Sequence, residues 1–147
     1  MKLMKSVDKV LAQMGSSKAT KRAYTEPLTA EQTKQIPGEQ IAISETGGIW
    51  AGIQELNGYM FMELIVLDTT KIKTFKGATL KFLGENELTL TSDSKELKSD
   101  FSDLFNRWLT QISVEVSKKD LNFIKKKKYT QVELNVKKKS LLFDVKK

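Results

Sequence analysis

The sequence contains no histidine and no cysteine. It therefore offers no imidazole base, no thiolate nucleophile and no zinc or iron–sulfur site of the usual kind. Carboxylate, lysine and hydroxyl groups remain, but they form no recognisable catalytic arrangement. One polar stretch holds four acids, but its spacing is not that of a calcium loop; they are Asp93, Glu96, Asp100 and Asp103. We therefore expect a protein that is not an enzyme and that holds no metal and no cofactor.

Long apolar runs are also missing. No stretch of about 18 apolar residues predicts a membrane-spanning helix. Charged residues interrupt the first eight positions, so the apolar core of a signal peptide is not present there. We expect a cytoplasmic protein. The 147 residues, 39% of them hydrophobic and 29% charged, are typical of one globular domain.

The positive charge is concentrated near the C-terminus. The chain has a net charge of +7, yet residues 1–116 hold 14 basic and 15 acidic side chains. Residues 117–147 hold 11 lysines against Asp120, Glu133 and Asp144. A lopsided distribution of this kind indicates an anionic partner. The candidate anion-binding residues are Lys125, Lys126, Lys127, Lys128, Lys137, Lys138, Lys139, Lys146 and Lys147.

These lysines fall into two clusters at opposite ends of a predicted hairpin, so we expect no single convergent pocket. An extended polyanion or an anionic membrane surface could contact both clusters. The alternative is structural, because lysines at helix ends and hairpin tips stabilise the helix dipole and keep sheet edges soluble. Nucleic-acid modules usually add exposed aromatic residues, and here only Tyr129 is a candidate. Nucleic acid and membrane are therefore possible partners, although the pattern does not favour them.

The first forty residues are predicted to form an arm. Residues 2–14 have the period of an amphipathic helix, which Gly15 ends, and a polar linker follows. A short helical turn begins after Thr29, where Gln32 completes a capping box. The apolar stripe of the first helix could pack on the domain or bind a protein partner, including a second copy. It consists of Leu3, Met4, Val7, Val10, Leu11 and Met14.

From Ile41 onward the pattern alternates as in β-strands. Asn57-Gly58 predicts a tight hairpin, and Ser117 with Asp120 predicts the start of a short helix. The segment 92–106 has no clear assignment. We predict an α+β, mainly β domain over residues 41–147: an antiparallel barrel or sandwich of eight to nine strands. It has the N-terminal amphipathic helix before it and the short helix before its last hairpin. The predicted strands are Ile41–Ser44, Ile49–Gln54, Tyr59–Leu67, Lys71–Phe75, Ala78–Leu83, Glu87–Ser92, Arg107–Val116, Tyr129–Val136 and Leu141–Val145.

The segment Trp108–Val145 reads as a strand, then Ser-Lys-Lys-Asp-Leu-Asn-Phe-Ile, then Tyr-Thr-Gln-Val-Glu-Leu-Asn-Val, then a basic hairpin. It resembles the C-terminal part of small uncharacterised bacterial β-rich proteins. The resemblance covers about a quarter of the chain and implies a β fold, with no catalytic residues.

Three functions are compatible with the sequence. The first is a non-enzymatic binding or protein-interaction module. The second is a β-barrel that encloses a small apolar ligand, although residues of this kind usually fill a core. The third is binding of a polyanion or anionic lipid through the lysine clusters. The residues that would line an apolar cavity are Met60, Met62, Phe82, Trp108 and Phe143.

Overall fold

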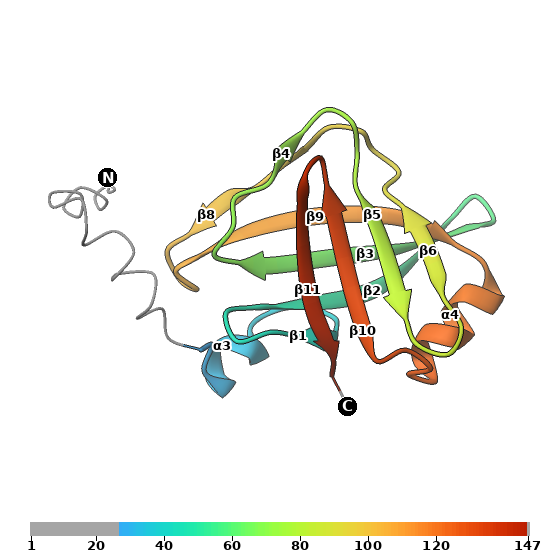
Figure 1. Ribbon diagram of the computed structural model, residues 1–147, viewed down its shortest axis with the longest axis horizontal. Coiled ribbons are helices and arrows are strands. Elements are labelled where there is room, and N and C mark those ends of the chain that lie inside the picture. The colour runs from blue at the N-terminus through green and yellow to red at the C-terminus, as the bar shows by residue number, and fades with distance from the viewer. Residues whose placement is uncertain (1–26, 147) are drawn as a thin grey trace, which may run out of the picture.

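The computed structural model describes residues 27–146 and consists mainly of β-strands (Figure 1). The amphipathic helix predicted over residues 2–14, with its apolar stripe, lies outside these residues, as does Lys147. The elements are α3 (Ala30–Lys34), β1 (Glu39–Ile43), β2 (Gly48–Leu56), β3 (Tyr59–Asp68), β4 (Lys73–Thr74), β5 (Thr79–Leu83), β6 (Leu88–Thr91), β7 (Leu97–Lys98), β8 (Asp100–Ser102), β9 (Arg107–Val116), α4 (Lys118–Lys125), β10 (Gln131–Val136) and β11 (Lys139–Val145).

Nine of these strands form one antiparallel sheet in the order β6-β5-β10-β11-β1-β2-β3-β9-β8. The sheet folds over itself, so that β10, β11, β5 and β6 run across β2, β3 and β9 (Figure 1). At the fold's open side, β6 reaches β9 through an isolated bridge between Ser92 and Val114. Over the described residues the sheet does not close into a barrel. The coarse prediction of a mainly β, antiparallel fold is therefore confirmed.

The main hydrophobic core lies between the two halves of the folded sheet. The alternation in the sequence predicts its inward positions correctly on β5, β6, β10 and β11, because successive side chains of a strand point to opposite faces. On β9 it does so for Ile112, Val114 and Val116 but not for Trp108, which was expected on the same side and does not belong to the core. These inward residues are Leu80, Phe82, Leu88, Leu90, Ile112, Val114, Val116, Val132, Leu134, Val136, Leu141, Phe143 and Val145.

A second, smaller cluster covers part of the outer face of the sheet. Ile36 follows α3 and packs with Trp50, Leu67 and Phe105. The end of β3 is therefore covered on both faces, as its apolar run predicts, whereas its first residue, Tyr59, is exposed. The packing of the domain thus includes residues within the range predicted as an arm.

Arg107 is buried beside this outer cluster. Its guanidinium donates to the carbonyl oxygens of Thr46 and Phe105. Burial lowers the pKa of Arg107 below its usual value, and the negative charge of Asp68 partly offsets this effect. Asp68 in turn accepts hydrogen bonds from Thr46 Oγ1 and Thr70 N. We interpret this buried group as a structural link between the β9 start and two neighbouring turns.

Local signals in the sequence place the turns and helix starts correctly. Asn57 and Gly58 both have positive φ, 51° and 86°, as a tight hairpin turn requires. Thr29 and Ser117 each accept a hydrogen bond from the backbone three residues on, and the side chains of Gln32 and Asp120 complete both capping boxes. The short helix before the last hairpin is therefore confirmed as α4.

Tyr129 corrects one expectation from the sequence. It is not an outward aromatic residue, because only 1% of it is exposed. Its ring packs edge-on against Phe82, with centroids 5.1 Å apart, and its hydroxyl donates to Ile41 O at 2.9 Å. Burial, and to a smaller extent the charge of Glu39, raises the pKa of Tyr129 to about 12.

Candidate anion-binding pocket

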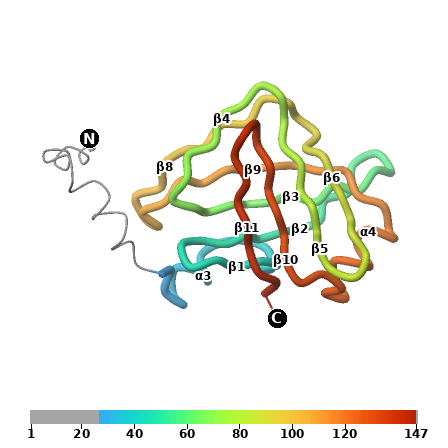
Figure 2. The backbone as a smooth tube through the Cα atoms, viewed as in Figure 1, coloured from blue at the N-terminus to red at the C-terminus, as the bar shows by residue number. Residues whose placement is uncertain are grey.

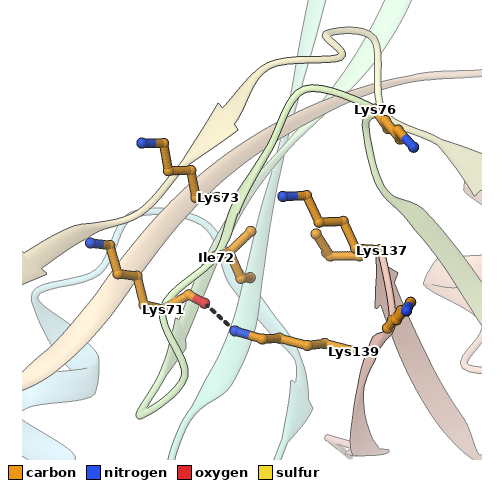
Figure 3. Close-up of a pocket in the computed structure, with 8 residues that line it drawn as sticks. Lys71, Ile72, Lys73, Lys76, Lys137 and Lys139 are labelled. Atoms are coloured by element: carbon orange, nitrogen blue, oxygen red, sulfur yellow. Dashed lines mark hydrogen bonds between the residues drawn. The ribbon is translucent and has the colours of Figure 1, made fainter.

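Six lysines from two distant segments surround one pocket of about 780 Å³. Three come from the segment 71–76, which includes β4, and three from the tip of the β10–β11 hairpin. Figure 2 allows the reader to follow the chain over this tip, and Figure 3 shows the side chains around the pocket. We call this site the lysine pocket. Its lining residues are Lys71, Ile72, Lys73, Lys76, Val136, Lys137, Lys138 and Lys139.

Buried hydroxyl groups hold the 71–76 segment in place. Ile72 N donates to Ser99 Oγ at 2.7 Å, and Ser99 N donates to Ile72 O at 2.8 Å. Ser99 Oγ also lies 2.7 Å from Thr110 Oγ1 on β9. Because Ile72 points inward, its neighbours Lys71 and Lys73 are exposed. The fold therefore fixes the backbone from which these two lysines extend.

A hydrogen bond connects the hairpin tip to this segment. Lys139 Nζ donates to Lys71 O at 3.2 Å, between residues 68 positions apart in the sequence (Figure 3). Lys137 adopts a positive φ of 55°, as the tight turn between β10 and β11 requires. An ammonium group has three donors. Lys139 therefore keeps two of its N–H groups for a ligand.

The pocket carries uncompensated positive charge. Its lining includes no acidic residue, and within residues 27–146 none of its six lysines forms an ion pair with a carboxylate. Next to the pocket, Lys73 lies directly opposite Lys98 in the β4–β7 pair. Like charges facing each other across two strands are destabilising. An arrangement of this kind attracts anions, because a bound anion relieves the repulsion.

Three aromatic side chains lie near lysines of the pocket, although none of them belongs to its lining. The Lys71 ammonium lies over the ring of Trp108, 5.1 Å from its centroid. Phe101 contacts Trp108 edge-on at 5.2 Å and is 47% exposed. Phe75, which directly precedes the pocket residue Lys76, is 63% exposed. The expectation that Tyr129 alone could provide an outward aromatic ring near the lysines is therefore wrong.

The other predicted cluster does not form a comparable site. Lys125 and Lys127 border a cavity of about 50 Å³ that also includes Glu39. Lys128 borders a mixed polar pocket of about 620 Å³, together with Glu87 and Asp120. These lysines follow α4, where positive charge complements the carbonyl end of the helix dipole.

Two further lysines of this cluster lie at a turn and near the chain end. Lys126 is the C-cap of α4, and Lys127 Nζ donates to the carbonyl oxygen of Lys146. Lys146 N in turn donates to Ile41 O at 3.1 Å. Lys125–Lys128 and Lys146 are therefore spread over several local environments. Of the predicted anion-binding lysines, only Lys137–Lys139 lie in the lysine pocket, together with three lysines that were not predicted.

The residues that were expected to line an apolar cavity do not line either of the two larger pockets. Met62, Phe82 and Phe143 are buried in the main core, against which Met60 also packs. Trp108 lies outside this core and contacts Phe101 and Lys71. None of them lines the lysine pocket or the mixed pocket beside α4. Within the described residues no group of three or more acidic side chains could hold a metal ion, and no helix has the length and hydropathy to cross a membrane.

Sequence reasoning missed three residues of the site: Lys71, Lys73 and Lys76. A signal was present, because Lys71 and Lys73 alternate with Ile72 and Thr74, and the segment 71–76 contains three lysines and no acid. That signal could not indicate where the segment lies. Its meeting with Lys137–Lys139 depends on the path of the chain between them.

Comparison with known proteins gives no match: no protein-family model, no curated protein and no solved structure matches this chain. The resemblance of residues 108–145 to bacterial β-rich proteins and the cytoplasmic location therefore stay predictions.

Proposed function

We propose that this protein is a non-enzymatic binding module whose lysine pocket holds the phosphate or sulfate groups of a polyanion. The observation that carries the proposal is the convergence of six lysines on one pocket with no acidic residue in its lining. The sequence alone favours two separate charge clusters, and a convergent pocket is a stronger argument for a ligand.

The dimensions and energetics of the pocket support this proposal. A volume of about 780 Å³ exceeds what one phosphate needs and falls within the usual range of ligand pockets, about 300–1,000 Å³. The six lysines that line the pocket carry like charge, and no acidic residue in the lining offsets it. Each anionic group that enters it gains several favourable interactions, and counterions released from a polyanion add to the binding free energy.

Heparin binding provides a direct test with a matched control. The pocket variant replaces Lys137, Lys138 and Lys139 with glutamine. The control replaces Lys125, Lys126 and Lys128, which removes the same charge near the opposite end of β10. We expect the pocket variant to bind heparin about tenfold more weakly at about 0.1 M salt, and the control to lose less than about threefold.

The salt dependence and stability of the variants complete this test. The logarithm of the binding constant should fall less steeply with the logarithm of salt concentration in the pocket variant than in the control, because fewer anionic groups are neutralised. The pocket variant should also unfold at the same or a higher temperature, since like charges have been removed. Equal losses of affinity in both variants would contradict a specific pocket.

A further inference from the structure

We infer that the polyanion is single-stranded nucleic acid, whose phosphates occupy the lysine pocket and whose bases stack on Phe75 and Phe101. This inference rests on the proposed anion-binding function and adds the class of ligand. It follows from the position of exposed aromatic rings beside the pocket, a feature that a purely anionic ligand would not need.

Charged and aromatic side chains are exposed along the segment 71–76. Lys71, Lys73 and Phe75 are exposed, while Ile72 and Thr74 between them are buried. Exposed residues two apart on an extended chain lie about 7 Å from each other. Lys71 and Lys73 therefore extend from the same side of the segment, and Phe75 and Lys76 follow in the bend after β4.

A continuous set of contacts connects an exposed aromatic ring to the lysines. Phe101 contacts Trp108, Trp108 lies under the Lys71 ammonium, and the Lys71 carbonyl accepts from Lys139. Trp108 is partly buried and supports Phe101, which is the more exposed of the two rings. Ring surface therefore adjoins the positive charge of the pocket at Lys71, through Trp108.

Single-stranded nucleic acid has the chemistry that matches this surface. Proteins that bind it combine a positively charged groove with aromatic rings on which bases stack. A duplex hides the faces of its bases, and heparin has no aromatic rings. A bilayer also offers phosphate and an apolar layer, but a flat surface contacts the rim of a concave pocket more readily than its floor, which here includes the buried Ile72 and Val136.

The experiment measures fluorescence anisotropy with a labelled oligothymidylate of about twelve nucleotides, within the site sizes known for single-strand binders. A duplex of the same length, heparin, and vesicles of equal parts phosphatidylserine and phosphatidylcholine serve as the other probes. The test variant is Phe75→Ala, and Phe75→Tyr retains the ring. The matched control is Tyr59→Ala. Tyr59 is similarly accessible, at 59% exposed, but it lies at the start of β3, and it is the opposite end of β3, at Asp68, that pairs with Trp108.

The inference predicts that the oligothymidylate binds more tightly than the duplex, although the duplex has the higher charge density. Phe75→Ala should weaken oligothymidylate binding at least about fivefold, the lower end of the effect of one stacked base. It should leave heparin binding unchanged. Phe75→Tyr and Tyr59→Ala should bind the oligothymidylate as the unmodified chain does.

Two results would overturn the inference while leaving the proposed function intact. One is equal or tighter binding of the duplex, with no effect of Phe75→Ala, which indicates recognition of phosphate alone. The other is vesicle binding that depends on Phe75 without any preference for single strands, which indicates a membrane ligand. By contrast, heparin binding that is insensitive to Lys137, Lys138 and Lys139 contradicts the proposed function itself.

Discussion

Replacing Tyr129 with phenylalanine should change the stability of the protein in opposite directions at neutral and at high pH. At neutral pH the Tyr129 hydroxyl donates to Ile41 O at 2.9 Å in a buried environment. Removing this bond costs about 1 kcal/mol. The cost stays near that value because Ile41 O also accepts from Lys146 N.

The sign reverses at high pH because folding keeps Tyr129 protonated. Its pKa in the folded protein is about 12, whereas an unfolded chain ionises near pH 10. The unfolded state therefore loses its proton first, and stability is lost as pH rises from about 10 to about 12. The loss amounts to about 2 to 3 kcal/mol, at about 1.4 kcal/mol for each pH unit. The phenylalanine variant does not lose this stability.

Urea unfolding of both proteins across this pH range provides the assay. The difference between their free energies of unfolding cancels the titration of the lysines, which both proteins share. Tyr129→Phe should be about 1 kcal/mol less stable near pH 7, equally stable near pH 11, and more stable near pH 12. A difference that stays constant from pH 7 to pH 12 would refute the argument that Tyr129 is buried and neutral.

Two further substitutions test the framework of the site. Ser99→Ala removes the acceptor of Ile72 N. We expect the free energy of unfolding, measured with urea, to fall by about 1 to 3 kcal/mol, and heparin to bind more weakly. Unchanged heparin affinity would show that the pocket does not depend on this hydrogen bond. Gly47 directly precedes β2, and in Gly47→Ala the new Cβ would lie 1.8 Å from Leu67 O. Gly52 lies within β2, and a Cβ added there would meet nothing within 4 Å. Gly47→Ala should therefore lower the melting temperature strongly and Gly52→Ala only slightly; equal effects would contradict the close backbone approach.

The sequence predicts those parts of the fold that depend on neighbours along the chain. The hairpin at Asn57-Gly58 and the start of α4 at Ser117 follow from local backbone and capping chemistry. The strand predicted at Lys71–Phe75 is shorter in the structure, where β4 covers only Lys73 and Thr74, which pair with β7. Segment 92–106 stays unassigned because β7 and β8 are two and three residues long, too short for a clear period.

The position of Tyr129 shows where pattern reasoning fails. Strand alternation applies within β10, which begins at Gln131. Tyr129 precedes it and follows four lysines, so its direction depends on the turn after α4 and not on the strand period. In the structure this turn directs the ring toward Phe82 and the main core.

The candidate site is half predictable for a related reason. The charge excess identifies Lys137–Lys139 from the sequence. Their neighbours Lys71, Lys73 and Lys76 become visible once the sheet is folded, because the contact from Lys139 to Lys71 joins residues 68 positions apart. Sequence composition can therefore indicate an anionic partner, while the convergence of charge that makes a pocket is a property of the tertiary fold.

A titration of ¹⁵N-labelled protein with heparin, followed by backbone amide shifts, tests the lysine pocket most directly. The proposed function predicts that the largest shifts fall on residues 71–76 and 137–139 and saturate together with one binding constant. Shifts centred on residues 125–128, or spread evenly over all lysines, would contradict a polyanion site at the lysine pocket.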